Sequence, residues 1–475
     1  MRDDEYVSHD AIALAELIAK RDVSAREVLD AAIARIEARN PAINAVILRM
    51  FDYARAALAA GLPNGRFTGV PFLLKDLGQM VDGVVTSNGS RLFANNRGNH
   101  DSTLVARYKS AGLVICGKTN TPELGLATTT EPVLHGPTRN PWKIDSSAGG
   151  SSGGAAAAVA AGFVPIAHAS DGGGSIRVPA SCCGLFGLKP TRGRVPLGPD
   201  AVEGWGGLST VHAVSRTVRD SALLLELTAG EELGAPYHAP PKEAYSSLLE
   251  RAPKALKIGI CLEPFTGAAL DPEVRAIVER AARTCEGLGH RVEAAKPAID
   301  QDEFKGAHGV IAISHSAATV DARVRALGRA LTEADVEAVT WSNYHAAKAM
   351  QAIDFAKAMN AIRRIGQEVA RFFTRYDLLL TPTMACLPPK LGALDMTSKD
   401  TSRYVTLLYE MIAFTALFND SGNPAMSVPL GRSANGLPVG VQFVAAFGNE
   451  SLLLRTARQL EAVGAFTPSL APTGA

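Results

Sequence analysis

The first sixty residues show apolar positions at helical spacing. Residues 11–20 are rich in Ala and Leu, and Ser24 with Glu27 forms a capping box ahead of a second apolar stripe over 28–36. The capping box predicts where that second helix begins, because its two side chains satisfy N–H groups that a helix start leaves free. We therefore expect N-terminal helices over residues 1–60.

Beyond residue 60 the pattern alternates between short apolar runs and longer periodic segments. The short runs predict buried strands at 70–74, 113–116, 258–262, 376–381, 425–429 and 440–445. Longer segments predict helices at 155–161, 269–289, 333–375 and 451–463. This alternation favours a layered α/β fold. A proline cluster between 233 and 255 indicates a surface connection within one domain.

Composition and charge disfavour several classes of function. Of the 475 residues, 47% are hydrophobic and 20% are charged, which is typical of globular proteins and unlike disordered chains. The 48 basic and 47 acidic residues leave a formal net charge of +1, so the chain lacks the overall basic field of nucleic-acid-binding proteins. A neutral small molecule fits this balance better than a polyanion, and we expect no nucleic-acid partner.

The sequence predicts a cytoplasmic protein with no membrane span, disulfide framework or metal site. Its first residues are acidic, which is untypical of a secretory signal. The 25 residues from 146 to 170 carry no Asp, Glu, Lys or Arg, but their Gly, Ser and Pro content indicates buried protein interior. The six cysteines are scattered without a CxxC pair, as is typical of reduced thiols. His and Cys spacing does not match a metal-binding cluster.

Three motifs compete as the source of the chemistry, and the first is a phosphate-loop sequence. Residues 112–119 match G-x-x-x-x-G-K-[ST] letter for letter. A phosphate loop needs exposed N–H groups between its glycines, but here the intervening residues, 113–116, have strand character. Gly112 instead occupies the position of a glycine that ends a helix. A nucleotide-binding protein is therefore disfavoured, but stays open as an alternative.

The second motif is G-x-S-x-G over residues 149–153, the pattern of a nucleophile elbow. An elbow follows a strand, and residues 140–145 do not have the sequence of a strand. The hydrolases that use an elbow also need a late histidine, whereas the last histidine here is His345. We therefore do not expect Ser151 to be an elbow nucleophile.

The third motif lies within residues 149–198, which hold 12 of the 44 glycines. Asp171 is followed by three glycines and Ser175. Consecutive glycines let backbone N–H groups turn toward one point, with no side chain to block a substrate carbonyl. An oxyanion hole has this requirement, because it stabilises negative charge that develops during acyl transfer. Taken alone, the sequence also fits an ordinary tight loop.

Several segments together resemble the amidase signature family. They are Gly149–Gly154, Asp171–Pro179, Lys75–Asp76 at the end of an apolar strand, Gly117–Asn120, Asn140–Trp142, Gly187–Thr191 and Gly440–Gln442. The likeness is dense from about 65 to 200 and thinner from about 370 to 463. It implies one amidase-signature domain over residues 1–475, folded as an α/β/α sandwich with a central mixed β-sheet flanked by helices.

The resemblance implies a serine amidase that needs no cofactor. Ser175 is the implied nucleophile and Lys75 the neutral base. Ser151, which follows a cis Gly150–Ser151 bond, is the implied bridge between them. The implied oxyanion hole consists of the N–H groups of Gly172, Gly173, Gly174 and Ser175. In this mechanism the substrate's acyl group is carried on Ser175 and then released by water.

Further residues are expected to support this site. Ser152 is expected to hydrogen-bond locally, and the spacing of Asp171 and Arg177 suggests that they pair and brace the glycine loop. Lys75 can act as a base only when it is neutral, and burial favours the neutral form. His168 lies near the motif on an apolar stretch, and we expect it to be a core residue and not the base.

Within the family, four stretches are similar to the branch of 6-aminohexanoate cyclic-dimer hydrolases. They are Thr129–Pro132, Thr138–Trp142, Lys189–Arg194 and Asn419–Pro424. The chain departs from common family patterns at Ala148 and Gly172, neither of which is an implied reacting group. The resemblance implies hydrolysis of a small, neutral amide, either linear or cyclic. A subunit of an RNA-dependent amidotransferase remains an alternative, and a homodimer is open because family members are often dimers.

Overall fold

The computed structural model describes residues 1–472. Its strands are β1 (Val46–Arg49), β2 (Pro71–Lys75), β3 (Val114–Thr119), β4 (Arg139–Asn140), β5 (Lys143–Ser147), β6 (Ile166–Asp171), β7 (Phe186–Lys189), β8 (Thr210–Ser215), β9 (Lys257–Ile260), β10 (Arg291–Ala294), β11 (Leu378–Pro382), β12 (Ala425–Arg432) and β13 (Pro438–Ala445). Short 3-10 turns are η1 (Arg91–Phe93), η2 (Glu123–Gly125), η3 (Trp205–Gly207) and η4 (Glu333–Asp335).

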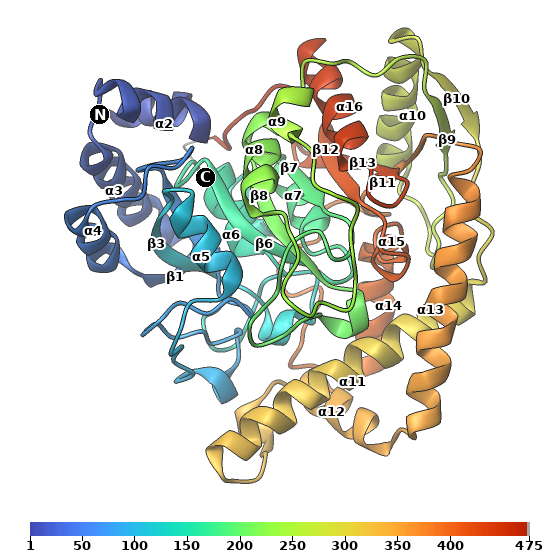
Figure 1. Ribbon diagram of the computed structural model, residues 1–475. Coiled ribbons are helices and arrows are strands. Elements are labelled where there is room, and N and C mark those ends of the chain that lie inside the picture. Colours follow the sequence, from blue (N-terminus) through green and yellow to red (C-terminus); the bar gives the residue numbers. More distant parts are fainter. Residues whose placement is uncertain (473–475) are drawn as a thin grey trace.

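The α-helices precede, connect and follow these strands (Figure 1). They are α1 (Asp3–Ser8), α2 (Ala11–Lys20), α3 (Ala25–Ile43), α4 (Phe51–Ala60), α5 (Thr103–Ser110), α6 (Gly153–Ala160), α7 (Arg177–Cys183), α8 (Val218–Thr228), α9 (Tyr245–Leu248), α10 (Pro272–Gly287), α11 (Gln301–Leu327), α12 (Ala338–Ala349), α13 (Ala352–Phe372), α14 (Thr401–Met411), α15 (Leu417–Asp420) and α16 (Glu450–Ala462).

Eleven strands form one mixed sheet in the order β1-β3-β2-β6-β8-β7-β12-β13-β11-β9-β10, and β4 with β5 forms a separate pair. β2 runs parallel to β3 and β6, whereas β8 is antiparallel to both β6 and β7. Helices surround this sheet in Figure 1. The predicted α/β/α arrangement with a central mixed sheet is confirmed.

The central strands are buried along their whole length, including β2, β3, β6, β8 and β13. A strand covered on both faces has no solvent side, so its sequence is a continuous apolar run instead of an alternation. The predicted strands at 70–74 and 440–445 have this pattern, and β2 and β13 confirm them. β6 went unpredicted because its sequence mixes Ala with His, Ser and Asp.

The predictions for the two N-terminal helices are confirmed. α2 spans the predicted residues, and Ser24 and Glu27 form the expected capping box at the start of α3. The prediction of one helical stretch over 333–375 was wrong in its continuity. A new helix, α13, begins directly after Gln351. The N–H of Gln351 donates to the Asp354 carboxylate, a contact that is typical of the start of a helix.

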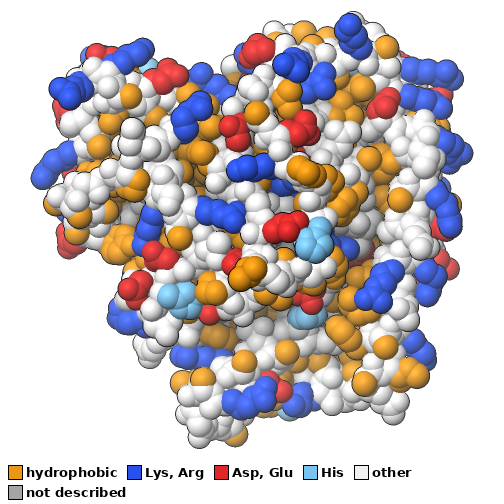
Figure 2. All heavy atoms as spheres, viewed as in Figure 1, with side chains coloured by type: hydrophobic (Ala, Val, Ile, Leu, Met, Phe, Trp, Pro, Cys, Tyr) orange, Lys and Arg blue, Asp and Glu red, His pale blue; other side chains and the backbone are white. Residues whose placement is uncertain are grey.

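Helices α11 and α12 lie together at the lower end of the molecule in Figure 1, and α13 rises from them along one side. α11 packs against both α12 and α13. On the face drawn in Figure 2, acidic and basic side chains are interspersed, in agreement with the net charge of +1. No helix within residues 1–472 combines the length and the apolar content that crossing a membrane requires. The six cysteines are free thiols.

Candidate active site

A buried lysine amine is the centre of the candidate site. Lys75 is the last residue of β2 and is fully buried. Its Nζ lies 2.7 Å from Ser151 Oγ, 2.9 Å from Ser152 Oγ and 2.9 Å from Ser170 Oγ. The side chain therefore points at three hydroxyl groups from two other segments of the chain.

The carboxylate of Asp76, the next residue in the chain, does not form an ion pair with the Lys75 amine. Asp76 instead faces Lys118, with 3.3 Å between Nζ and Oδ1, and accepts hydrogen bonds from the N–H and hydroxyl of Ser87. Burial lowers the pKa of Lys75 to about 7, and the charge of Asp171 opposes this shift. The amine is thus substantially neutral near pH 7.

Hydrogen-bond chemistry assigns a direction to the contacts of the neutral amine. The Ser152 hydroxyl lies 3.2 Å from the carbonyl of Ser170 and donates to it, so Ser152 Oγ accepts a hydrogen bond from Lys75. A neutral amine has two N–H donors and one lone pair. It can therefore bind three hydroxyl groups, if two of them accept its N–H hydrogens and the third donates its own hydrogen to the lone pair. Ser151 Oγ is the nearest of the three. This arrangement can move a proton from Ser151 to Lys75.

Ser151 and Ser152 sit where the polypeptide turns into a buried helix. The peptide bond between Gly150 and Ser151 is cis, as the resemblance implied, and Ser152 precedes the first residue of α6. A Cβ on Gly150 would lie 2.4 Å from the carbonyl oxygen of Thr129, so this approach requires glycine. The expectation that Ser152 hydrogen-bonds locally was wrong, because its hydroxyl contacts Lys75 in β2 and Ser170 in β6, which are distant in sequence.

Ser170 was not among the predicted site residues. It lies in β6, one residue before Asp171, and its hydroxyl is as close to Lys75 as that of Ser152. β2 and β6 are parallel neighbours in the sheet, which brings their carboxyl ends together. The only sequence signal was its position beside Asp171, and that signal does not reveal which strand pairs with β2.

The glycine loop connects β6 to α7 and carries Ser175. Within residues 1–472, the N–H groups of its four residues, Gly172, Gly173, Gly174 and Ser175, donate to no protein acceptor. Gly174 has φ of +140°, and a Cβ there would lie 2.4 Å from Thr415 Oγ1. Four free donors beside one serine meet the requirement of the expected oxyanion hole, whose catalytic role stays a prediction.

A buried ion pair braces this loop, and the predicted pairing of Asp171 with Arg177 is confirmed. The guanidinium donates to both carboxylate oxygens of Asp171, at 2.9 Å and 2.8 Å. Oδ2 of Asp171 also accepts the N–H of Ile176 at 3.1 Å. Although burial alone would raise the pKa of Asp171, the charge of Arg177 holds it well below its usual range. Asn419 donates to the same carboxylate and to the main-chain carbonyl of Asp171.

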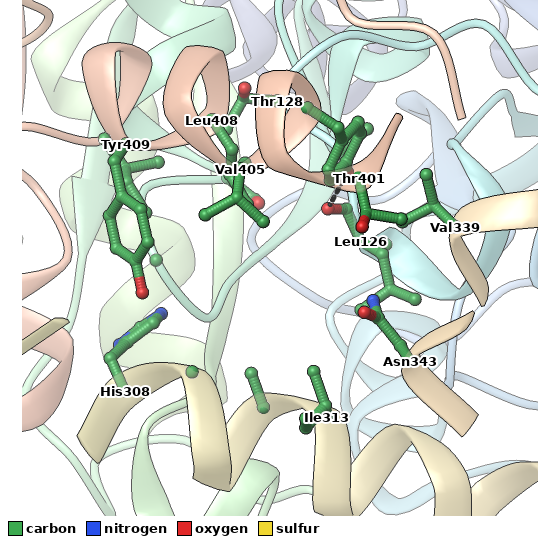
Figure 3. A pocket seen from close by; sticks show the side chains of 18 of the residues that line it. Leu126, Thr128, His308, Ile313, Val339, Asn343, Thr401, Val405, Leu408 and Tyr409 are labelled. Atoms are coloured by element: carbon green, nitrogen blue, oxygen red, sulfur yellow. Dashed lines mark hydrogen bonds between the residues drawn. The ribbon is translucent and has the colours of Figure 1, made fainter. Parts of the chain in front are cut away.

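Ser175 lies between two cavities. One of about 260 Å³ is lined largely by aliphatic and aromatic side chains from α11, α12 and α14, and Figure 3 shows it from close by. The other, of about 230 Å³, is lined by both Ser151 and Ser175. No hydrogen bond joins these two serines within residues 1–472, although they share that cavity.

The competing motifs have other roles in the structure. Residues 114–119 form the buried strand β3, so the residues after Gly112 present no phosphate-binding loop.

The expectation that no strand precedes the second motif was wrong, because β5 ends at Ser147. β5 forms a two-stranded sheet with β4, however, outside the central sheet that an elbow requires. His168 is fully buried, as predicted, and desolvation and the charge of Lys75 lower its pKa to about 3.

Comparisons with known proteins agree with this geometry. A family model described as Amidase matches residues 27–454. A 6-aminohexanoate-cyclic-dimer hydrolase from Paenarthrobacter ureafaciens is 40% identical over 466 residues, covering 95% of this chain and 94% of its relative. A solved 6-aminohexanoate cyclic dimer hydrolase complexed with substrate superposes with a TM-score of 0.93 at 38% identity, covering 98% of this chain and 100% of that chain.

An amidotransferase is a more distant neighbour. The solved glutamyl-tRNA(Gln) amidotransferase chain from Thermotoga maritima is 29% identical, with a TM-score of 0.76 over 99% of this chain and 98% of that chain. Both values are lower than those for the hydrolase structure, which favours the hydrolase interpretation over the amidotransferase alternative. The chain is an amidohydrolase and belongs to the Amidase family.

Proposed function

We propose that the chain hydrolyses amide bonds with Ser175 as nucleophile, Ser151 as proton bridge and Lys75 as base. The observation that carries this proposal is the fully buried Lys75 amine, hydrogen-bonded to Ser151 beside a loop of free N–H donors. Serine needs a base to become a good nucleophile, and a neutral amine of pKa about 7 can serve at neutral pH.

In the first half of the reaction, Ser175 Oγ attacks the amide carbon. Its proton passes to Ser151 Oγ, and the proton of Ser151 passes to Lys75 Nζ. This transfer requires the Ser175 hydroxyl to rotate within hydrogen-bond distance of Ser151 in the cavity that they share. The carbonyl oxygen becomes an oxyanion, and the N–H groups of residues 172–175 stabilise it.

The C–N bond then breaks, and the leaving amine takes the proton back from Lys75 through Ser151. Water next attacks the acyl group on Ser175 by the same proton route, which releases the acid and restores the serine. Ser152 and Ser170 hold the amine in place through their hydroxyl groups. Asp171 and Arg177 fix the loop, so the oxyanion donors need no reorganisation during the reaction.

The substrate we propose is a small, neutral amide with aliphatic chains, and specifically an oligomer of 6-aminohexanoate. Among the described residues, no Asp, Glu, Lys or Arg lines the 260 Å³ cavity, so it offers no side chain of permanent opposite charge to a carboxylate or an ammonium group. A cyclic oligomer has no charged ends, whereas a linear one has two. The cavity therefore favours the cyclic form, the substrate class in the name of the 40%-identical relative.

A substrate panel tests this proposal. Aliphatic amides, aryl amides, amino-acid amides and cyclic and linear 6-aminohexanoate oligomers are ranked by kcat/KM, with the Ser175→Ala variant as control. We expect the neutral aliphatic amides and the cyclic oligomer to rank highest. Preference for the charged amino-acid amides would contradict the substrate assignment. Turnover that appeared only with charged tRNA and partner chains would support the amidotransferase alternative.

We further propose that residues 1–475 act as one amidase-signature domain in the cytoplasm, with no nucleic-acid partner. The span of the family model and a sheet that takes strands from residue 46 to residue 445 support the single domain. The net charge of +1 and the interspersed charges on the face drawn in Figure 2 support the absence of a polyanion partner. A homodimer is proposed on the family resemblance, and light scattering of the purified protein tests it.

A further inference from the structure

The 260 Å³ cavity contains a histidine that the proposed mechanism does not use. His308 comes from α11, and 7% of its side chain is exposed. In Figure 3 its imidazole stands at one side of the cavity, near Tyr409 and across from Asn343. Most of the surrounding wall is aliphatic, with Leu126, Ile313, Val339, Val405 and Leu408 among its side chains.

A buried carboxylate fixes the orientation of this imidazole. His308 Nδ1 lies 2.8 Å from Oδ1 of Asp420, whose side chain is fully buried at the end of α15. Because a carboxylate can only accept hydrogen bonds, Nδ1 carries the hydrogen. When the ring is neutral, Nε2 holds a lone pair and acts as an acceptor.

That acceptor atom faces the oxyanion loop and has no protein partner. A Cβ built on Gly173 would lie 3.3 Å from Nε2 of His308. Within residues 1–472, Nε2 makes no hydrogen bond, and its neighbour Tyr409 donates its hydroxyl hydrogen to the carbonyl of Lys305. A ligand that buries this acceptor without offering a donor leaves it unsatisfied, which weakens binding.

We propose that His308 is a positioning and specificity residue, whose Nε2 accepts a hydrogen bond from a second N–H of the substrate. The ligand class is an amide that carries another N–H group besides the scissile one, such as a diamide with an aliphatic spacer. This inference rests on the proposed amide hydrolysis at Ser175 and names what that same site selects. Asp420 acts through His308, because it holds the ring in the accepting tautomer.

Matched substrates isolate the contribution of that N–H. One pair is the p-nitroanilides of 6-acetamidohexanoic and 6-acetoxyhexanoic acid, which differ by a distal amide N–H and an ester oxygen of similar shape. A second pair places the same two distal groups on the amine side, as N-substituted benzamides. We expect wild type to prefer the distal amide by roughly tenfold in kcat/KM in one of the pairs, mainly through KM.

Two variants distinguish recognition from structural support. His308→Asn keeps an amide near the Nδ1 position to contact Asp420 but has no atom at Nε2, whereas His308→Gln places its amide near Nε2. We expect His308→Asn to abolish the preference and His308→Gln to retain part of it, with thermal unfolding close to wild type. The control is His315→Asn, on the same helix but outside both cavity linings, which should keep the full preference.

The proposal is overturned if wild type shows no preference in either pair. It is also overturned if His308→Asn lowers kcat/KM equally for both members of a pair, because that result indicates a structural role. Calorimetric titration of the same compounds into the Ser175→Ala variant gives the preference as a ratio of Kd values without turnover. If the Ser175→Ala variant still hydrolysed these compounds, Ser175 would not be the nucleophile. The effect of the His308 variants on the preference within each pair could still be measured from kcat/KM.

Discussion

Replacing Lys75 with Met tests the central element of the proposed mechanism. Met is of similar length and apolar, so it fits the buried site but cannot accept a proton. Among residues 1–472, Ser151 Oγ has a hydrogen bond with Lys75 and with no other side chain. No second base is therefore in place to replace the lysine. General-base assistance contributes about 10²–10⁴-fold. We therefore expect kcat/KM of Lys75→Met to fall by about that factor.

The pKa of Lys75 also predicts how wild-type activity changes with pH. With a pKa of about 7, roughly a tenth of the amine is neutral at pH 6 and nearly all of it at pH 9. The neutral form is the active one, so kcat/KM should rise through pH 7 and reach a plateau. His168→Asn should keep this profile, because the pKa of His168 lies at about 3 and outside the range.

The same lysine makes a prediction about stability, with a defined sign. Its pKa is about 7 in the folded protein and 10.5 in its unperturbed state. Between these values the unfolded chain binds a proton that the folded chain does not, so folding stability is lost as pH falls from about 10 to 7. The free energy of unfolding of wild type, relative to Lys75→Met, should change by about 1.4 kcal/mol per pH unit in that window.

Urea denaturation of wild type and Lys75→Met between pH 7.5 and 9.5 measures this slope, and other titrating groups cancel in the difference. A flat difference would show that Lys75 is charged in the folded protein and would refute the neutral base. Activity that did not rise through pH 7 on any amide of the panel would refute it independently. An apparent pKa that disappeared in His168→Asn would transfer the base role to the histidine.

Four further substitutions test the rest of the site. Ser175→Ala should remove turnover and leave the fold intact, and a fluorophosphonate should label wild type at Ser175; labelling at Ser151 would favour the elbow interpretation. Ser151→Ala should lose less activity than Lys75→Met if a water molecule replaces the missing hydroxyl between Ser175 and Lys75, and single-turnover kinetics measures both losses. Gly174→Ala places a Cβ against Thr415 at a left-handed φ, and should lower kcat by about 10²-fold with little change in KM. Arg177→Lys loses the bidentate contact with Asp171, and urea denaturation should show a loss of about 3 kcal/mol in the free energy of unfolding. A change within about 0.5 kcal/mol, which is typical of neutral surface substitutions, would contradict a stabilising role of this ion pair at the glycine loop.

Much of the site was predictable from the sequence because its requirements are local. Lys75 ends an apolar run, which indicates burial, and burial lowers the pKa of an amine. The glycine loop and its ion pair lie within seven consecutive residues, 171–177, so their proximity follows from chain connectivity. The family resemblance then supplied the roles that spacing alone left open between a tight loop and an oxyanion hole.

Contacts that depend on sheet order or on the distant C-terminal half were not predictable in the same way. Ser170 reaches Lys75 only because β6 lies beside β2, and a single sequence does not give the order of strands. His308 and Asp420 are separated by 112 residues and meet through the packing of α11 against the segment that holds α15. Helix α11 itself went unpredicted, since its apolar positions do not form one regular stripe along its 27 residues.

The ion pair at the glycine loop also determines how the two parts of the site are coupled. Asn419 accepts a hydrogen bond from Arg177 and donates to Asp171, and the next residue, Asp420, holds His308. The oxyanion donors and the proposed N–H acceptor are therefore attached to one buried network of hydrogen bonds. Buried polar networks of this kind tolerate change poorly, because each lost partner leaves an unsatisfied group. The aliphatic residues on α12 and α14 that line the cavity lie outside this hydrogen-bond network, so we expect them to be a second place, besides His308, at which substrate preference can be altered.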